Sequence, residues 1–288
     1  MREFLVGLWP LIKSVGQNRL ALFGAAVVFL VAVVAIFAPF IATHDPLAQD
    51  PYNKLQPPSI EHLMGTDDLG RDVFSRVVYG SRTTVAVAIT SVALATVVGI
   101  PLGLVAGYSG RWINAGIMRV MDTLLAFPTL ILALAIASSL GPGFKSSVTA
   151  IAVLGLPIFA RLVCASTLSV KETEYVLAAK SIGCSGFRIL GFHIFPNVTS
   201  PIIVQGTLFI GYAILLEAAL SFIGLGIPPP SPTWGQMLRA SYPYLQDQPW
   251  LPLASGIPVF LVVLAINFLG DGLRDALDPK LKSVRHVV

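Results

Sequence analysis

The stretch "EYVLAAKSIGCSGFRILGFHIFPN", residues 174–197, decides how the chain is organised. It is half polar, with one acid and three glycines, yet it lies between two of the most apolar runs in the sequence. The whole chain has 288 residues, of which 55% are hydrophobic and 12% are charged, and its mean hydropathy is +0.78. A soluble domain carries about twice that charged fraction. The composition therefore predicts a polytopic membrane protein.

Six apolar runs are long enough to cross a bilayer as helices, which takes about 20 residues. They are residues 20–42, 83–107, 117–140, 147–168, 200–224 and 251–271. The first run exceeds the apolar region of a cleaved signal peptide, which is about 7–15 residues long. We predict an all-α fold with six transmembrane helices. Prolines at 101, 128, 157 and 258 interrupt four of the runs and permit kinks.

The basic residues divide unevenly between the two predicted sides of the membrane. The side that holds both termini carries thirteen Lys and Arg residues, and the other side carries six. The thirteen are Arg2, Lys13, Arg19, Arg111, Arg119, Arg161, Lys171, Lys180, Arg188, Arg274, Lys280, Lys282 and Arg285; the six are Lys54, Arg71, Arg76, Arg82, Lys145 and Arg239. Since Lys and Arg collect in cytoplasmic loops, both termini are predicted to be cytoplasmic. No basic cluster indicates nucleic-acid binding.

Residues 174–197 then form the largest cytoplasmic loop, and their periodicity predicts two short helices. The first ends at the C-capping glycine Gly183, and the second ends at Pro196. The predicted apolar faces are Tyr175, Ala178, Ala179 and Ile182 on the first helix, and Phe187, Leu190 and Ile194 on the second. Two interpretations stay open: helices that lie on the lipid headgroups, or a docking element for a cytoplasmic partner.

The loop resembles the "EAA" loop of ABC-importer permeases. That family pattern reads Glu-Ala-Ala, three residues, Gly, nine residues, Ile, any residue, Leu-Pro; here Ala178, Ala179, Gly183 and Pro196 match it. The chain departs from it at three positions, with Leu177 for Glu, His193 for Ile and Phe195 for Leu. The resemblance implies that this loop couples the membrane subunit to an ATPase through Glu174, Tyr175, Ala178, Ala179, Gly183, Phe187, His193 and Pro196.

Three further stretches look like the second permease subunit of dipeptide and oligopeptide ABC importers. They are "LMGTDDLGRDVFSRVVYGSRT" (63–83), "AALSFIGLGIPPPSPTWGQML" (218–238) and "NFLGDGLRDALDPKLK" (267–282). The likeness runs from about residue 13 to residue 282. It implies a type I ABC importer permease fold in a prokaryotic inner membrane. The implied domains are 1–82 with the first transmembrane helix and an extracytoplasmic loop, 83–272 as the transmembrane core with the coupling loop at about 169–198, and 273–288 as a cytoplasmic tail.

By the same resemblance, the function is to form a translocation pathway for peptides together with a second permease subunit. Further implied partners are two cytoplasmic ATPase subunits, an extracytoplasmic substrate-binding protein and membrane lipid. No cofactor is expected on this chain, because ATP and Mg²⁺ would bind the ATPases. The alternatives are import of a nickel chelate, glutathione or another small solute by the same kind of subunit. Outside this class, an ion-coupled carrier or a structural membrane protein would also be polytopic.

Several polar residues fall within or beside the predicted spans, where a charge costs about 2.5–3.5 kcal/mol on insertion scales. We take Glu217, Gln205, Asn267 and Asp122 as candidates for the pathway or for helix interfaces, with Arg119 a candidate partner of Asp122 one turn away. In the outer loops, Asp67, Arg71, Asp72 and Trp234 are candidates for contacts with a partner subunit or binding protein, and Trp234 is expected at the membrane interface.

Enzymatic motifs are missing from the sequence, so we expect no enzyme. "GPGFKSS" lacks the Gly-Lys-Ser/Thr run of a phosphate-binding loop and is expected to close a turn between two spans. Neither "GYSGR" nor "GCSGF" is a Gly-x-Ser-x-Gly nucleophile motif. The four histidines are scattered and the two cysteines make no ligand pattern, so no metal site is expected either.

Overall fold

The structure, a computed structural model, describes residues 18–277. Within this range the chain forms α-helices joined by loops, and its β-structure is limited to one isolated bridge between Thr66 and Asp72. The predicted all-α fold is confirmed. Five of the basic residues on the predicted cytoplasmic side lie outside the described residues, as does most of the predicted tail 273–288. They are Arg2, Lys13, Lys280, Lys282 and Arg285.

Five of the predicted spans appear as long apolar helices. They are α2 (Arg19–Ile36), α4 (Val73–Tyr108), α7 (Phe144–Val170), the continuous segment Gly186–Ile223 that ends in α10 (Phe195–Ile223), and α12 (Trp250–Leu277). The run 20–42 is shorter as a helix than predicted, because it breaks at Phe37 and resumes as the short α3 (Ala38–Ile41). The turn "GPGFKSS" leads into α7 as expected, with Gly141 and Gly143 at positive φ.

The third predicted span, 117–140, is bent instead of straight. It consists of α5 (Arg111–Ala126) and α6 (Thr129–Leu140), whose axes meet at 93°. Pro128 causes the break, because a proline disfavours helical backbone at the residue before it, and Phe127 is indeed extended with ψ 138°. Pro101, Pro157 and Pro258 lie inside continuous helices.

The centre of the bundle is a close contact between α4 and α7. Gly99, Gly103 and Gly107 recur every fourth residue along α4; a Cβ at Gly103 would lie 2.6 Å from the carbonyl oxygen of Ala160 in α7. Such a stripe of small residues lets two membrane helices approach closely. Beside this contact, the ring of Phe159 in α7 packs edge-on against the ring of Phe209 in α10, with centroids 5.6 Å apart. Both residues belong to the main hydrophobic core.

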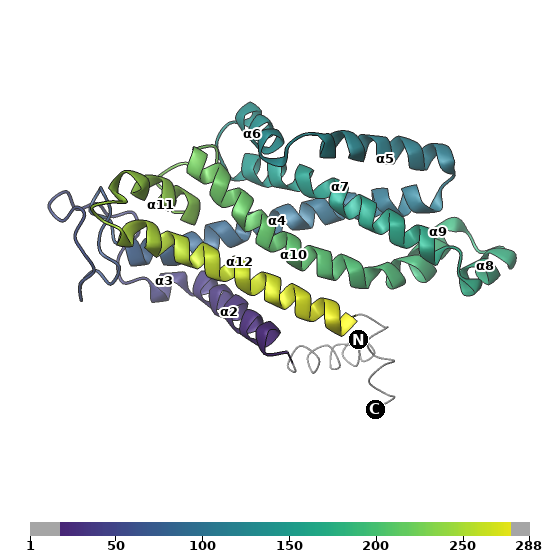
Figure 1. The fold of residues 1–288 in the computed structure, drawn as a ribbon, viewed down its shortest axis with the longest axis horizontal. Coiled ribbons are helices and arrows are strands. Elements are labelled where there is room, and N and C mark those ends of the chain that lie inside the picture. Colours follow the sequence, from purple (N-terminus) through teal and green to yellow (C-terminus); the bar gives the residue numbers. More distant parts are fainter. Residues whose placement is uncertain (1–17, 278–288) are drawn as a thin grey trace.

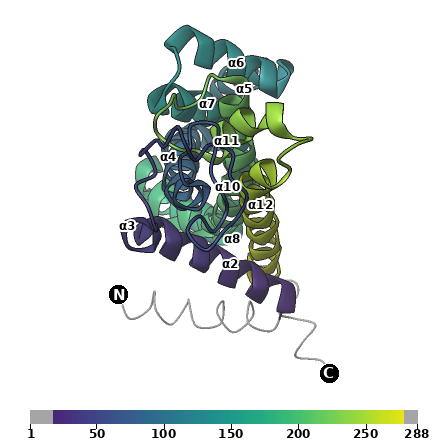
Figure 2. The same cartoon turned by 90° about the vertical axis from the view of Figure 1, so that its left-hand side faces the viewer.

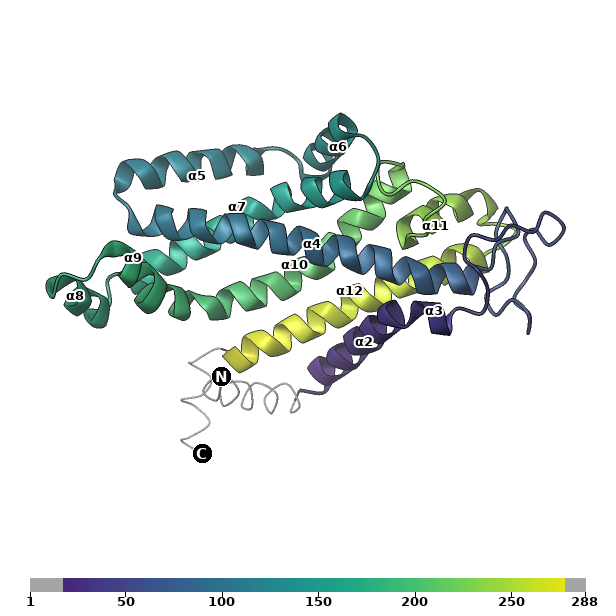
Figure 3. The same cartoon turned by 180° about the vertical axis from the view of Figure 1, so that it is seen from behind.

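The molecule is elongated, with a different structure at each end (Figure 1). One end carries α8 (Glu174–Ser181) and α9 (Gly186–Arg188), and we call it the α8 end. The other carries α11 (Trp234–Ser241) and the irregular segment 42–72, and we call it the α11 end. Seen from the α11 end, α2 lies on one side and α5 and α6 on the opposite side (Figure 2). From behind, α5 runs alongside α4 and α7 (Figure 3).

Candidate functional site

The α8 end is a folded element that packs on the ends of α4 and α7. Val176 and Ala179 of α8 are buried together with Ile189 and Ile194, which follow α9, against Val163 of α7. Lys171, just before α8, donates from Nζ to the carbonyl oxygen of Gly107 at 3.0 Å. These contacts anchor the loop, so it moves with the helices beneath it.

Gly183 ends α8 as predicted. Its φ is +81°, in the left-handed region that favours glycine, and the next N–H, of Cys184, bonds to the carbonyl oxygen of Ala179 at 3.1 Å. A Cβ at Gly183 would meet no neighbouring atom, so the backbone angle and not space selects glycine here.

The outward side of the α8 end is apolar and exposed. Phe187 is 92% exposed and Ile182 is 81% exposed. Three further large apolar side chains of this end are also exposed: Tyr175, Leu177 and Phe192. We call these five residues the apolar cap. A patch of large apolar side chains on a folded element indicates a surface that another protein or lipid covers.

The predicted apolar faces of the loop are only partly correct. On α8, Ala179 faces inward while Tyr175 and Ile182 face outward, so those residues do not share one buried face. In the second helix, Phe187 is exposed and Ile194 is buried, because residues Ile189–Ile194 form a π-helix. Its wider turn changes which side chains lie above one another, so a spacing of 3.6 residues no longer predicts the face.

Pro196 does not end the second helix, contrary to the prediction. It lies in the first turn of α10, directly after the π-helical turn, and the helix continues to Ile223. A proline is tolerated in a first helical turn, where its missing N–H has no intrahelical partner to lose. The second half of the loop, from Gly186, and the fifth span are therefore one continuous helical segment. Glu174 and Ala178 are exposed on α8, and His193 is half buried.

Glu217 is fully buried inside the subunit. It lies on α10, and its Oε1 accepts a hydrogen bond of 2.7 Å from the Ser221 hydroxyl one turn later. Its Oε2 has no hydrogen-bond partner among residues 18–277. This position favours a role between helices over contact with a transported molecule.

The other polar candidates of the spans lie nearer the surface. Gln205 lines a hollow near the α8 end together with Asn197 and Arg274, and Asn267 is exposed on α12. Asp122 pairs with Arg161 of α7 instead of the candidate Arg119. Because α5 begins at Arg111, Asp122 lies about 16 Å along the helix from its start. An exposed ion pair on a helix of a predicted span requires cover by protein or water.

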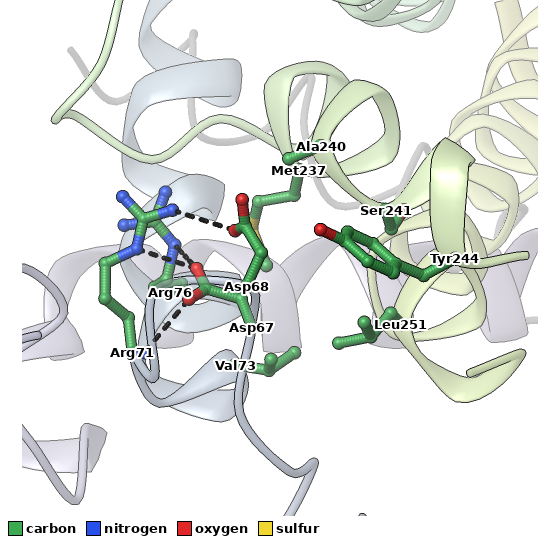
Figure 4. A pocket seen from close by; sticks show the side chains of 10 residues that line it. All are labelled: Asp67, Asp68, Arg71, Val73, Arg76, Met237, Ala240, Ser241, Tyr244 and Leu251. Carbon is green, nitrogen blue, oxygen red and sulfur yellow. Dashed lines mark hydrogen bonds and ion pairs between the residues drawn. The ribbon is translucent and has the colours of Figure 1, made fainter. Parts of the chain in front are cut away.

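The α11 end contains a buried network of charges. Asp67 Oδ2 lies 2.7 Å from Nε of Arg71 and 3.5 Å from Nε of Arg76, and both guanidinium groups are almost completely buried. Arg76 also donates to the carbonyl oxygen of Pro46 at 3.0 Å. Figure 4 shows these groups on one side of a small hollow, with Tyr244 and Leu251 on the other. The network ties the segment 42–72 to the start of α4.

Asp72 is the N-cap of α4. Its Oδ2 accepts a hydrogen bond of 2.8 Å from the backbone N–H of Ser75. Burial acts to raise the pKa of this carboxyl, but hydrogen bonds from Ser75 and His62 outweigh it and hold the pKa below its ordinary value. The side chain is therefore an ionised cap inside the subunit.

Trp234 is buried, so the prediction of an interfacial tryptophan is wrong. Only 2% of it is exposed, and its Nε1–H donates to the carbonyl oxygen of Val77 in α4 at 3.0 Å. The ring lies against Gly80, where a Cβ would sit 3.1 Å from it. The short helix α11, which the sequence pattern did not reveal, holds the ring there with Thr233 as its N-cap.

The fold is that of a multi-pass membrane subunit, with a buried charge network at the α11 end and the exposed apolar cap at the α8 end. Residues 99–283 match the family described as binding-protein-dependent transport system inner membrane component, and residues 13–58 match the N-terminal transmembrane domain of oligopeptide transport permease C. The chain belongs to the family of binding-protein-dependent transport system inner membrane components. The resemblance seen in the sequence is confirmed.

Curated relatives are similar over nearly their whole length. The chain is 48% identical to the dipeptide transport system permease protein of Alkalihalophilus pseudofirmus, over 94% of this chain and 89% of the relative. It is 43% identical to the di/tripeptide transport system permease protein of Pseudomonas aeruginosa, over 94% and 91%. It is 41% identical to the glutathione transport system permease protein of Pectobacterium atrosepticum, over 93% and 89%.

A solved structure shares the fold. The inward-facing MetNI methionine ABC transporter has a chain that superposes with a TM-score of 0.59 at 18% identity, covering 70% of this chain and 96% of that one. The architecture is thus that of an ABC importer permease, as predicted.

Proposed function

We propose that the chain is a permease subunit of an ATP-driven peptide importer, and that its α8 end docks onto a cytoplasmic ATPase. The apolar cap carries this proposal. Its side chains stand on an element that is itself anchored to α4 and α7, so force applied to the cap reaches the spans. A segment that merely lay on lipid would not need the contact between Lys171 and the end of α4.

The remaining components follow from the family and from its relatives. A second permease subunit would cover the exposed ion pair of Asp122 and Arg161 and complete the pathway. Two ATPase subunits would bind ATP and its Mg²⁺ and hydrolyse the nucleotide, and this chain would take no part in that reaction. A binding protein would deliver the substrate at the α11 end, where the candidates Asp67, Arg71 and Asp72 serve first to hold the subunit together.

Peptides are the proposed substrates because two of the relatives described above are named for dipeptides or di/tripeptides. Import of glutathione, itself a small peptide, is the second candidate, supported by the relative named for it. Competition separates these candidates. We expect unlabelled dipeptide in excess to abolish uptake of labelled dipeptide by cells expressing the full set of subunits. Glutathione and a nickel chelate should leave that uptake intact.

The docking surface is tested by Phe187→Glu. An unpaired charge in a buried interface costs several kcal/mol, so we expect association with the ATPase to weaken by about a hundredfold or more. The matched control is Ile60→Glu at the α11 end, where the side chain is 99% exposed. The measurements are ATPase co-purification and dipeptide uptake. Wild-type values for Phe187→Glu in both would refute docking through the cap.

Both termini are proposed to be cytoplasmic, with the α8 end on the same side. The described chain agrees with such an arrangement, since α2 starts and α12 ends facing the α8 end (Figure 1). In a Cys184→Ser background, Ile60→Cys should react with an impermeant maleimide from outside intact spheroplasts. Ser185→Cys should react only after permeabilisation. The reverse pattern would overturn the orientation.

A further inference from the structure

Three residues that are distant in the sequence meet at the α11 end. His44 follows α3, His62 lies within the irregular segment, and Asp72 precedes α4. Nδ1 of His62 lies 3.0 Å from Oδ1 of Asp72, and Nδ1 of His44 lies 3.8 Å from the same oxygen. The two imidazole rings are 4.8 Å apart between centroids. Three potential ligand atoms, one per residue, all lie within 4.8 Å of one another.

The two oxygens of Asp72 have separate tasks. Oδ2 faces the backbone, where it accepts from the Ser75 N–H at 2.8 Å and from the Thr43 hydroxyl at 3.4 Å. Oδ1 faces the two imidazoles. The capping contacts hold the carboxylate in place, so Oδ1 is presented to the histidines in a fixed position without any further residue.

A hydrogen bond to Asp72 explains the position of only one of the two histidines. His62 is within hydrogen-bonding distance of Oδ1, whereas 3.8 Å is too long for His44. Nδ1 of His44 instead lies 3.0 Å from its neighbour Thr43 Oγ1. Two ligand atoms on one tetrahedral ion lie about 3.4 Å apart when the bonds are about 2.1 Å long. The observed distances of 3.0 Å and 3.8 Å bracket that value, so small side-chain movements would bring all three atoms onto one ion.

We propose that His44, His62 and Asp72 bind one divalent transition-metal cation of the zinc class, which links three segments at the α11 end. Two imidazoles and one carboxylate suit Zn²⁺, and three protein ligands leave a fourth position open to water. The side chain of His44 is 37% exposed and that of His62 is 16% exposed, so an ion can enter from solvent. On binding, the ion would replace the proton shared between His62 and Asp72.

The ion would act as a structural link. The 27 residues between His44 and Asp72 include the Asp67 end of the buried charge network. A cation held by both histidines and the N-cap of α4 would restrain this irregular segment against the bundle. Because metal binds the folded arrangement, it should raise thermal stability with the logarithm of its concentration above the dissociation constant.

The test uses the full chain, purified in detergent with a histidine-free tag and stripped with a chelator. We expect Zn²⁺ titration to show one equivalent bound with micromolar affinity or tighter, together with a raised unfolding temperature. His44→Gln and His62→Gln should each weaken binding at least about tenfold, since even the loss of a residue that only orients a ligand costs about 10–100-fold. The double variant should lose both the binding and the thermal shift. Asp45→Asn, a neighbouring exposed carboxylate, is the control and should bind like the wild type.

Cobalt gives an independent readout. Co²⁺ bound by nitrogen and oxygen ligands should show visible d–d absorption that the double variant lacks. A thiolate charge-transfer band would instead place the ion at a cysteine and overturn the proposal. So would absence of a zinc equivalent in the wild type, or an unchanged equivalent in a double variant that still elutes as a folded protein.

Discussion

The two ends of the molecule solve opposite problems. The α11 end buries the charges of Asp67, Arg71 and Arg76 and satisfies them within the subunit. The α8 end instead leaves large apolar side chains exposed, among them Ile182 and Phe187. Buried charges are costly unless every partner is present, whereas exposed apolar groups become stabilising only when another molecule covers them. The charge network of the α11 end is thus complete in the single chain, and we propose that assembly covers the apolar cap of the α8 end.

This contrast predicts where a substitution acts. Changes in the buried network of the α11 end should destabilise the subunit itself. Changes on the apolar cap should leave the subunit folded and affect its association. Each of the following experiments pairs a substitution with a control of the same kind, so the location and not the chemistry is what differs.

The largest effect is expected from Arg76→Met. Methionine removes a buried cation that bonds Pro46 and lies 3.5 Å from Asp67, and breaking such a buried pair costs about 3–5 kcal/mol. Arg82→Met, on the same helix but exposed, should change stability by less than about 0.5 kcal/mol. Thermal unfolding and the yield of monodisperse protein in detergent measure both. Equal losses in the two variants would show that the network does not hold the α11 end together.

Sequence patterns predicted much of this fold, for identifiable reasons. Apolar runs of membrane length need no tertiary information, and five of them became long helices. Gly183 is visible because few residues tolerate its positive φ. The 93° bend could not be predicted from the sequence. Pro128, Pro101 and Pro157 all lie within apolar runs, and only packing decides which proline breaks its helix. The glycines at 99, 103 and 107, spaced by four, form a sequence pattern that indicates close packing of α4 against another helix.

An intermediate effect is expected from the adjacent alanines of α8. Ala178→Glu puts a charge on the exposed side, so it should weaken ATPase docking by about tenfold to a hundredfold with the loop intact. Ala179→Glu forces a carboxylate into the contact with Val163 and Val176, so it should cost at least about 2 kcal/mol locally. Hydrogen exchange over residues 174–197 separates the outcomes. Protection lost in both variants, or in neither, would erase the distinction between the two sides of α8.

The site residues were harder to predict than the spans. The positions in the loop came from family resemblance, but their orientation depended on a π-helical turn, which has no sequence signature in this chain. Trp234 looked like an interfacial anchor because aromatic residues collect at membrane surfaces. Its burial depends on α11 folding back onto α4, a contact between residues 157 positions apart. His44 and His62 follow no ligand spacing, so only the folded loop brings them to Asp72.

The smallest effect is expected from Trp234→Phe. The substitution keeps an aromatic ring against Gly80 and removes the hydrogen bond from Nε1 to the carbonyl oxygen of Val77. One such bond contributes about 1 kcal/mol, because water competes for its groups when the chain unfolds. For a chain of this size, that corresponds to a fall of about 2–4 °C in the unfolding temperature.

The matched control for this prediction is Trp112→Phe. Trp112 is 89% exposed at the start of α5, so the same substitution there should leave the unfolding temperature of the isolated subunit unchanged. Differential scanning fluorimetry in detergent resolves the difference. If Trp234→Phe has no effect on stability but lowers uptake delivered by the binding protein, Trp234 serves an outside partner. The α11 end would then depend on assembly as the α8 end does, and the contrast between the two ends would fail at this residue.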